Sequence, residues 1–347
     1  MSTTHKIIYD NSSQLLGIED ESVNLVVTSP PYPMIAMWDE MFGELNQEIS
    51  NMMNSGKNDE AFELMHKELD IVWKSLFRVL KNGGIACINI GDSTRTFDGV
   101  FKLYNSHSRI LNFCISLGFE SLPSIIWRKS TNAPNKFMGS GMYPVGSYVT
   151  LEHEHILVLR KGPRRTFDTY QSKSNRNASA FFWEERNKWF SDTWFDVHGK
   201  LQDIEASKRG RSAAYPFELA YRLINMFSVK NDLVLDPFLG TGTTTKAAIS
   251  SERNSVGFER DETLSELIVQ EIDGCRDFSN KYIEERLDRH LDFIKTRVKS
   301  GKEAKHKLNN HKGYCVSSQE VDISFNKITN IEMSKSEYEV FYEPLSR

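Results

Sequence analysis

The spacing of apolar and polar positions predicts short strands that alternate with helices along most of the 347-residue chain. Strands are expected at residues 6–9, 23–28, 85–90, 122–127, 155–159, 233–236 and 255–259. Helices are expected at residues 41–80, with a break near 54–57, and at 108–117, 215–227 and 262–300. Such alternation is typical of a mainly parallel sheet with helical crossovers. The sequence therefore predicts a doubly wound α/β fold.

Two parts of the chain depart from this pattern. Residues 162–212 lack regular periodicity and carry nine aromatic side chains among Arg, Lys, Ser and Asn. Aromatic rings beside basic and amide groups can contact nucleobases and phosphates, although most of these rings are expected to form a small core beneath the segment. Beyond Gly301, a basic linker at residues 302–307 precedes a strand-like alternation at residues 321–325, whose role stays open.

The apolar run Val23–Thr28 ends abruptly in Ser29, Pro30, Pro31 and Tyr32. Two consecutive prolines fix the backbone and keep the loop from collapsing into a helix. A plain turn after a strand would look the same. The meaning of this stretch therefore depends on the rest of the chain.

A glycine turn follows the apolar strand at residues 233–235. The strand runs into Asp236, and Gly240 and Gly242 then let the backbone approach a ligand closely before Thr243 begins a helix. This arrangement predicts a ligand-binding loop at the end of a strand.

The sequence of this loop limits the class of ligand that it can bind. A dinucleotide fingerprint would need a third glycine where Thr245 stands, and the spacing of a phosphate loop is not met either. The next strand ends in Glu259, whose carboxylate can accept hydrogen bonds from two ribose hydroxyls. The pattern therefore favours a nucleoside-containing ligand without a pyrophosphate.

Together, the Ser-Pro-Pro-Tyr stretch and the glycine turn resemble the DNA amino-methyltransferases that use S-adenosylmethionine. The order, with the tetrapeptide early and the glycine turn late, resembles the permuted beta class of that family. The resemblance covers most of residues 6–262 and implies a Rossmann-like methyltransferase fold in permuted order. It assigns catalysis to Ser29, Pro30, Pro31 and Tyr32.

By position, the resemblance assigns cofactor binding to Asp10, Asp236, Pro237, Phe238, Gly240, Gly242, Thr243, Glu259, Tyr215 and Pro216. The glycine turn would wrap the methionine end of S-adenosylmethionine, and Glu259 would bind its ribose. Asp10 would lie near the adenine amino group, with Asn11 as a close competitor. Tyr215 and Pro216 would begin a helix that closes over the methionine moiety, although that helix is also simply amphipathic.

The tetrapeptide suits chemistry at an exocyclic amine, whose lone pair is delocalised into the base. Acceptors at the Ser29 hydroxyl and the Pro30 carbonyl would free that lone pair to attack the sulfonium methyl. Tyr32 would stack on a base that has left the duplex. The turn lacks the cysteine that a ring-carbon methylase would need. In the resembling family, a first-position serine goes with N4 of cytosine and aspartate mostly with N6 of adenine, so N4-cytosine is expected and N6-adenine is the alternative.

The distribution of charge matters more than the net charge of -4. Between Trp127 and Arg176, nine basic residues face three acidic ones, which makes this segment able to contact a polyanion or simply a solvated surface. The residues expected to bind DNA are Trp127, Arg128, Lys129, Lys136, Arg164 and Arg165.

The resemblance divides the chain into three units. Residues 1–162 and 213–272 are expected to form the catalytic domain, and residues 163–212 a target-recognition insertion to which 135–149 contribute. Residues 273–347 would form a C-terminal extension that is mainly helical. The expected partners are double-stranded DNA and, because such enzymes commonly belong to restriction-modification systems, a cognate restriction endonuclease. The chain can be a monomer or a homodimer.

Composition excludes several other classes. The first ten residues have no apolar signal core, and no run approaches the roughly 20 apolar residues that span a bilayer, so a cytoplasmic enzyme without membrane contact is expected. The four cysteines show no paired spacing and are expected to be free thiols. Residues 151–155 place two histidines on one side of a strand without a third ligand nearby, so no metal is expected.

Two further classes of protein stay open. An enzyme that methylates RNA or a glutamine side chain can share a Pro-Pro-Tyr turn, but such relatives usually place the glycine loop first. A DNA-binding module without catalysis could keep the fold and use only the basic segment.

Overall fold

The computed structural model describes residues 1–129, 138–198 and 215–345, and a ten-stranded sheet forms its centre. In spatial order the strands are β10 (Thr193–Trp194), β6 (Phe119–Arg128), β9 (His153–Lys161), β3 (Leu80–Ile90), β2 (Val23–Thr28), β11 (Leu233–Asp236), β12 (Asn254–Glu259), β1 (Ser2–Tyr9), β16 (Glu337–Pro344) and β15 (Asn326–Ser334). The strands from β3 to β1 are parallel, whereas β9 and β16 run antiparallel to their neighbours. The predicted α/β fold with a mainly parallel sheet is confirmed.

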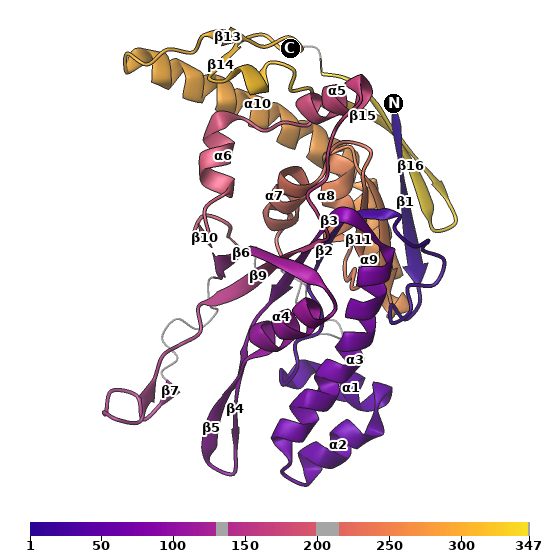
Figure 1. Cartoon of the computed structure of the whole chain (residues 1–347), viewed down its shortest axis with the longest axis vertical. Coiled ribbons are helices and arrows are strands. Elements are labelled where there is room, and N and C mark those ends of the chain that lie inside the picture. Colours follow the sequence, from indigo (N-terminus) through magenta and orange to yellow (C-terminus); the bar gives the residue numbers. More distant parts are fainter. Residues whose placement is uncertain (130–137, 199–214, 346–347) are drawn as a thin grey trace.

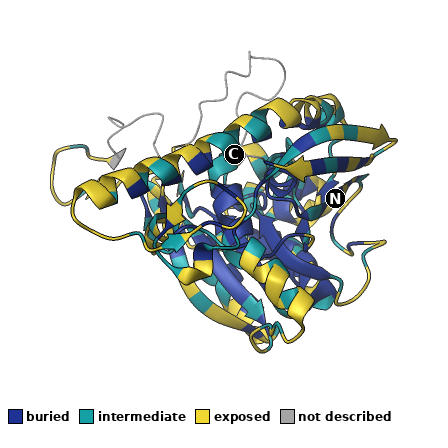
Figure 2. Ribbon diagram, turned by 90° about the horizontal axis from the view of Figure 1, so that it is seen from above, coloured by how far each residue is buried: buried dark blue, intermediate teal, exposed yellow. Residues whose placement is uncertain are grey.

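Helices cover both faces of this sheet (Figure 1). One face carries α1 (Asp39–Leu45), α2 (Gln47–Asn54), α3 (Asn58–Val79) and α4 (Ser106–Ser116). The other face carries α7 (Phe217–Phe227) and α8 (Thr243–Ser250). α9 (Ser265–Asp273) and α10 (Cys275–Lys299) pack on α8, and α6 (Trp183–Trp189) packs on α7. α5 (Tyr170–Ala178) has no buried residue. Figure 2 shows the buried strands between layers whose outer faces are exposed.

The alternation of side chains along the central strands explains the two layers. All six residues of β2 are buried, because Leu25 and Val27 pack toward α7 and α8 while Val26 packs toward α3. Neighbouring β11 divides in the same way, with Val234 on the side of Val27 and Leu235 on the side of Val26. The continuous apolar runs in the sequence therefore reflect strands buried on both faces.

The C-terminal segment differs from the expectation of a mainly helical extension. Its long helix ends at Lys299, and only a short 3-10 helix at Ser318–Glu320 follows. β15 and β16 then form a hairpin that adds two strands to the central sheet beside β1. Tyr338, Val340 and Tyr342 point to one side of β16 and pack with Ile7 of β1. The strand expected at residues 321–325 is a turn followed by irregular chain. The division of the chain into three units stays a prediction.

Residues 163–198 bury three of their nine aromatic rings fully and three more partly. Phe182, Trp189 and Trp194 are each at most 4% exposed and belong to the cores beneath α6 and α7. Tyr170 and Phe195 are the clearest exceptions, with exposed rings. This segment therefore serves mainly as a cover for one face of the sheet.

Short hairpins complete the described structure. They are β4 (Ser93–Phe97) with β5 (Val100–Tyr104), β7 (Met138–Gly139) with β8 (Ser147–Tyr148), and β13 (His306–Lys307) with β14 (Tyr314–Cys315). All four cysteines are free and buried, as expected. Across the described ranges, no helix has the length and apolar content needed to cross a membrane.

Candidate active site

The two sequence motifs lie at the ends of adjacent parallel strands. β2 and β11 pair in the register Leu25 with Val234 and Val26 with Leu235, so both strands end at the same edge of the sheet. Ser29 follows directly after β2, and the glycine loop follows directly after β11. Because the carboxyl ends of neighbouring parallel strands commonly build the ligand site of an open α/β sheet, this edge is the candidate active site.

Asp236 holds this edge together. Its Oδ1 accepts hydrogen bonds from the Thr28 hydroxyl at 2.6 Å and from the Phe238 N–H at 3.0 Å, and its Oδ2 accepts from the hydroxyls of Tyr215, at 3.1 Å, and Thr244. The carboxyl is 2% exposed, and burial raises its pKa. Because four protein donors bond to its oxygens, Asp236 ties the two loops together. Its contact with the cofactor stays a prediction.

The glycine loop fits a close ligand. Gly240 and Gly242 adopt the left-handed φ values of 58° and 90°, which favour glycine over residues with a side chain. Around the position that a Cβ of Gly240 would take, no atom of the described residues lies within 4 Å. Gly242 then caps α8, which begins at Thr243. The loop thus offers open backbone at the start of a helix.

Glu259 ends β12 beside this loop. Its Oε2 accepts the Gly240 N–H at 2.8 Å, and its Oε1 accepts the Asp261 N–H at 2.7 Å. Burial raises the pKa of this carboxyl. Each oxygen keeps a second lone pair, so the carboxylate can still accept ribose hydroxyls. The acceptor oxygens of Glu259 and the open backbone of the glycine loop fit S-adenosylmethionine.

The remaining predicted cofactor residues lie at the same edge but differ in surroundings. Asp10 follows β1, whose Tyr9 pairs with Glu259, and its side chain is exposed. Tyr215 is buried, and its hydroxyl donates to Asp236 at the start of the glycine loop, so it supports that loop from inside the protein. Pro216 caps the start of α7. Burial raises the pKa of Tyr215 well above its ordinary value.

The Ser-Pro-Pro-Tyr turn is tied to a hydrogen-bond network that sequence reasoning missed. The Tyr32 hydroxyl donates to Glu154 Oε2 at 2.8 Å and lies 3.1 Å from the Ser29 hydroxyl. Asn89 Nδ2 donates to both Tyr32, at 2.9 Å, and Glu154, at 2.7 Å. Lys129 completes the network at 2.8 Å from Glu154 Oε1. Burial and the neighbouring Glu154 carboxylate raise the pKa of Tyr32 well above its ordinary value.

One sequence signal could have revealed this network. Asn89 is the polar residue of an otherwise apolar run in β3, and it is 2% exposed. Glu154 belongs to the stretch at residues 151–155 that contains two histidines. β9 runs antiparallel to β3, which brings the beginning of β9 to the catalytic edge. The sequence does not reveal this direction. Gly91 admits the Tyr32 ring, because a Cβ there would lie 2.9 Å from Tyr32 Cε2.

The predicted DNA-binding residues separate into two groups. Arg128 ends β6 at the catalytic edge, Lys129 follows it, and both are exposed. The expectation for Trp127 is wrong, because its ring is 1% exposed and its Nε1 donates to the Val197 carbonyl at 2.9 Å. Lys136 lies outside the described residues.

Arg164 and Arg165 do not lie near the predicted catalytic turn. They follow the end of β9, which runs antiparallel to β3 and therefore carries them to the opposite edge of the sheet. There Arg165 pairs with Asp232 at 2.7 Å and packs on the backbone of Gly83 near the start of β3. Contact of these two arginines with DNA stays a prediction, at a distance from the catalytic turn.

Asp92, His107 and His155 form a cluster close to this edge, with their possible ligand atoms within 4.8 Å of one another. Asp92 accepts from His107 Nδ1 at 2.7 Å, and the rings of His107 and His155 stack at 3.9 Å. Stacked rings direct their in-plane lone pairs along parallel planes, not toward a common point. The cluster is therefore explained by hydrogen bonding and stacking, and the absence of a metal stays a prediction.

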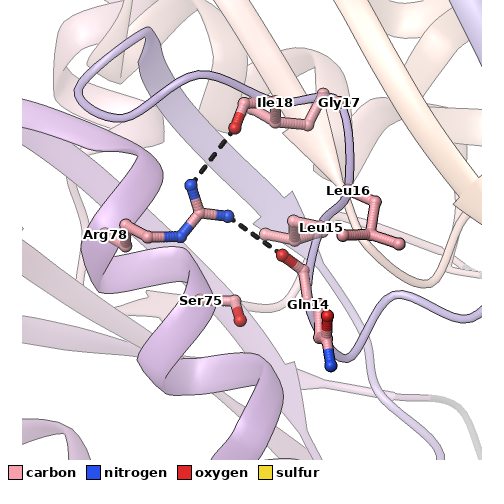
Figure 3. A pocket seen from close by; sticks show the side chains of 7 residues that line it. All are labelled: Gln14, Leu15, Leu16, Gly17, Ile18, Ser75 and Arg78. Atoms are coloured by element: carbon pink, nitrogen blue, oxygen red, sulfur yellow. Dashed lines mark hydrogen bonds between the residues drawn. The ribbon is translucent and has the colours of Figure 1, made fainter.

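A separate hollow lies between the loop at residues 14–18 and α3 (Figure 3). Arg78 crosses it and donates to the carbonyls of Ile18, at 3.2 Å, and Gln14, at 2.9 Å. This arginine satisfies the backbone of the loop. The predicted site residues do not contribute to its lining.

The sheet, the glycine loop and the Ser-Pro-Pro-Tyr turn at one edge define an α/β methyltransferase. Residues 23–270 match the DNA methylase family N6_N4_Mtase. The chain is 46% identical over 349 residues to the Type II methyltransferase M.MthZI of Methanothermobacter thermautotrophicus, which covers 100% of this chain and 97% of the relative. It is 48% identical over 283 residues to the Type II methyltransferase M.MjaI of Methanocaldococcus jannaschii. This alignment covers 78% of this chain and 92% of the relative.

Solved structures agree with this result. TTHA0409 of Thermus thermophilus, solved with S-adenosyl-L-methionine, aligns with a TM-score of 0.59 and 32% identity over 76% of this chain and 92% of that one. PvuII DNA methyltransferase, 17% identical with a TM-score of 0.50, shares the fold over 78% of this chain and 94% of that one. The chain belongs to the DNA methylase family and is a DNA amino-methyltransferase. Its cofactor is S-adenosyl-L-methionine, and the predicted Rossmann-like methyltransferase fold is confirmed.

Proposed function

We propose that this enzyme methylates N4 of a cytosine flipped out of duplex DNA, as a permuted beta class member of a Type II restriction-modification system. The hydrogen bond between Thr28 and Asp236 carries the proposal, because it holds the predicted catalytic turn and the predicted cofactor loop side by side. Ser29, the first residue of the tetrapeptide, supports cytosine. The Type II methyltransferases among its relatives support the biological setting.

The residues of this chain would bind the cofactor and would orient and activate the target amine. The glycine loop and Glu259 would hold the cofactor, which supplies a sulfonium methyl group and leaves as a neutral thioether. The Ser29 hydroxyl and the Pro30 carbonyl would accept the two N–H groups of the target amine and favour a tetrahedral nitrogen. Pro30 is buried, which keeps its carbonyl in a fixed place.

Tyr32 would support the flipped base. Its hydroxyl is held by Glu154 and Asn89, so the far end of the ring is fixed in position. A fixed aromatic face suits stacking with an unpaired base, which must leave the duplex before its amine can reach the cofactor. This role depends on the ring, and the hydroxyl anchors the ring.

Two exposed parts of the catalytic edge would contact DNA. Arg128 and Lys129 would bind phosphates. The hairpin of β7 and β8 presents Met142, Tyr143 and Val145, which are 86%, 77% and 98% exposed. Exposed apolar side chains beside a DNA-modifying site are suited to unstacked bases and groove walls.

A labelling experiment tests the proposal. The enzyme is incubated with methyl-labelled cofactor and unmethylated genomic DNA, which avoids any assumption about the recognition sequence, and nucleosides are analysed by mass spectrometry. Labelled 4-methylcytosine is the expected product. Labelled 6-methyladenine would replace the cytosine assignment, and unlabelled DNA would overturn the function. Ser29→Ala should lower the rate more than it lowers cofactor affinity.

A further inference from the structure

We propose that Glu154 orients the Ser29 hydroxyl through Tyr32 and receives, along the same hydrogen bonds, the proton that the target amine loses. The inference rests on the proposed function of the Ser-Pro-Pro-Tyr turn. It adds a residue from β9, a strand far from the motif in sequence, to the groups on which the reaction depends. Glu154 acts through Tyr32 and is therefore a positioning residue.

The direction of each hydrogen bond follows from the chemistry of the partners. The Tyr32 hydroxyl has one proton, and that proton is donated to Glu154 Oε2 at 2.8 Å. Ser29 Oγ lies 3.1 Å from the Tyr32 oxygen and must be the donor in that pair. Its lone pairs are then left to face the target amine. Without the carboxylate, Tyr32 could donate to Ser29 instead, and the serine would lose its acceptor orientation toward the base.

Asn89 and Lys129 reinforce this polarity. Glu154 Oε2 can only accept, so Asn89 must present its amide nitrogen, at 2.7 Å, and not its oxygen. The same nitrogen also donates to the Tyr32 oxygen at 2.9 Å, which further commits the tyrosine proton to Glu154. Lys129 Nζ lies 2.8 Å from the other carboxylate oxygen. Glu154 is 7% exposed, so these partners stand in for water around its charge.

The proton balance closes through the same atoms. When the amine nitrogen forms its bond to the methyl carbon, the carbon–sulfur bond breaks and sulfur keeps the electron pair. The amine proton passes to Ser29 Oγ, the serine proton to the Tyr32 oxygen, and the tyrosine proton to Glu154. The methylated base leaves neutral, and Glu154 becomes a neutral acid that later releases its proton to water. Tyr32 gives up one proton as it gains another and never becomes a phenolate.

Glu154→Gln is the informative variant. The Gln oxygen can occupy the place of Oε2 and still accept from Tyr32 and Asn89, but the amide cannot take up a proton at that position. Tyr32→Phe removes the link between Ser29 and Glu154 while it keeps the ring. Lys129→Gln removes the ion pair and keeps the carboxylate, and Glu120→Gln changes an exposed carboxylate at the far end of β6.

Single-turnover methylation of unmethylated genomic DNA is measured for these variants, beside cofactor and DNA affinities. Glu154→Gln and Tyr32→Phe should each lower the rate about 10²-fold with cofactor affinity within about twofold, and the double variant should lose no more than either alone. Lys129→Gln keeps the carboxylate and should lower the rate less than Glu154→Gln does. Glu120→Gln should match wild type.

A rate within twofold of wild type in Glu154→Gln or Tyr32→Phe, or multiplicative losses in the double variant, would overturn the relay. A wild-type enzyme that leaves DNA unlabelled would instead overturn the proposed function.

Discussion

Thr28 at the end of β2 donates a 2.6 Å hydrogen bond to Asp236 at the end of β11. Ser29 begins one residue after the donor, and the glycine loop begins one residue after the acceptor. Both partners are buried, at 0% and 2% exposure, so water does not compete for the bond. A single hydroxyl thus sets the spacing of two loops that lie 208 positions apart in the sequence.

Thr28→Val should weaken both the fold and cofactor binding. The substitution keeps the shape of the side chain but removes one of the four donors to the buried Asp236 carboxyl, which should cost about 1–3 kcal/mol of unfolding free energy. Urea unfolding measures that loss, and titration calorimetry should show a higher Kd for the cofactor. Thr28→Ser keeps the hydroxyl and serves as the control. Unchanged cofactor affinity in Thr28→Val would show that the bond does not set the loop.

Gly240→Ala should separate backbone strain from ligand contact. Gly240 and Gly301 both have left-handed φ values, of 58° and 76°, and open space where a Cβ would stand in the described structure. Each Ala variant should therefore lose a similar stability of about 1–2 kcal/mol. Only Gly240→Ala should raise the cofactor Kd, by at least about tenfold, because its methyl group enters the proposed cofactor site. Equal cofactor affinity in both variants would remove Gly240 from that site.

The sequence was sufficient for the parts of the site that are local. β2 was predicted with its observed bounds, because a run of apolar and β-favouring residues, interrupted only by Asn24, ends just before Ser29 and two prolines. The glycine loop was predicted from Asp236, Gly240 and Gly242, whose conformations depend on neighbouring residues. Local rules of this kind need no knowledge of which strands become neighbours.

The missed features depend on strand direction and pairing. Glu154 and Arg165 both lie on or next to β9, and its antiparallel direction sends the first to the catalytic edge and the second to the opposite edge. Trp127 belongs to a strand whose end is covered by β10, so its ring is buried instead of facing DNA. Long-range pairing of this kind leaves no periodic signal in the sequence.

Gly91→Ala should impair catalysis without removing any functional group. A Cβ at this position would lie 2.9 Å from Tyr32 Cε2 and 3.3 Å from Glu154 Cγ, so one of these side chains must shift. Displacement of about 1 Å near reacting groups can cost about 10²-fold in rate. Single-turnover rates should fall by about that factor, with little change in cofactor Kd. Gly274→Ala, whose nearest contact would be an ordinary 3.4 Å, is the control and should keep the wild-type rate.

Tyr143→Ala and Val145→Ala should weaken DNA binding without loss of stability. Both side chains are more than three-quarters exposed, so neither contributes much to the folded core. The loss of a stacking contact between Tyr143 and a base is worth about 1–3 kcal/mol, which corresponds to at least about a fivefold rise in Kd. Val145→Ala should change Kd in the same direction. Fluorescence anisotropy with mixed duplexes measures it. Val298→Ala on α10 removes an exposed apolar residue elsewhere and should bind DNA like wild type. Identical affinities for all three variants would place the DNA away from the β7–β8 hairpin.

Histidine burial should make the enzyme sensitive to mild acid. His5 is fully buried between the hydroxyls of Thr3 and Ser255, each at 2.8 Å, and burial lowers its pKa to about 3 from 6.5. Between these two values the unfolded chain binds a proton that the folded chain does not. The free energy of unfolding is therefore highest above pH 6.5 and falls as pH drops below it, by about 1.4 kcal/mol per pH unit for this one group. His66, with its pKa also lowered to about 3, adds a second contribution of the same sign.

His5→Gln isolates the first of these two contributions. The amide can bond to both hydroxyls but takes up no proton in this range, so the loss of unfolding free energy between pH 6.5 and 5.5 should be about 1 kcal/mol smaller than in wild type. Urea unfolding at pH 7.5, 6.5 and 5.5 gives the three values for each protein. His198→Gln changes an exposed histidine and should keep the wild-type dependence on pH. If His5→Gln lost stability as steeply as wild type, the acid sensitivity would have to come from His66 and other groups, because a buried neutral His5 requires the smaller slope.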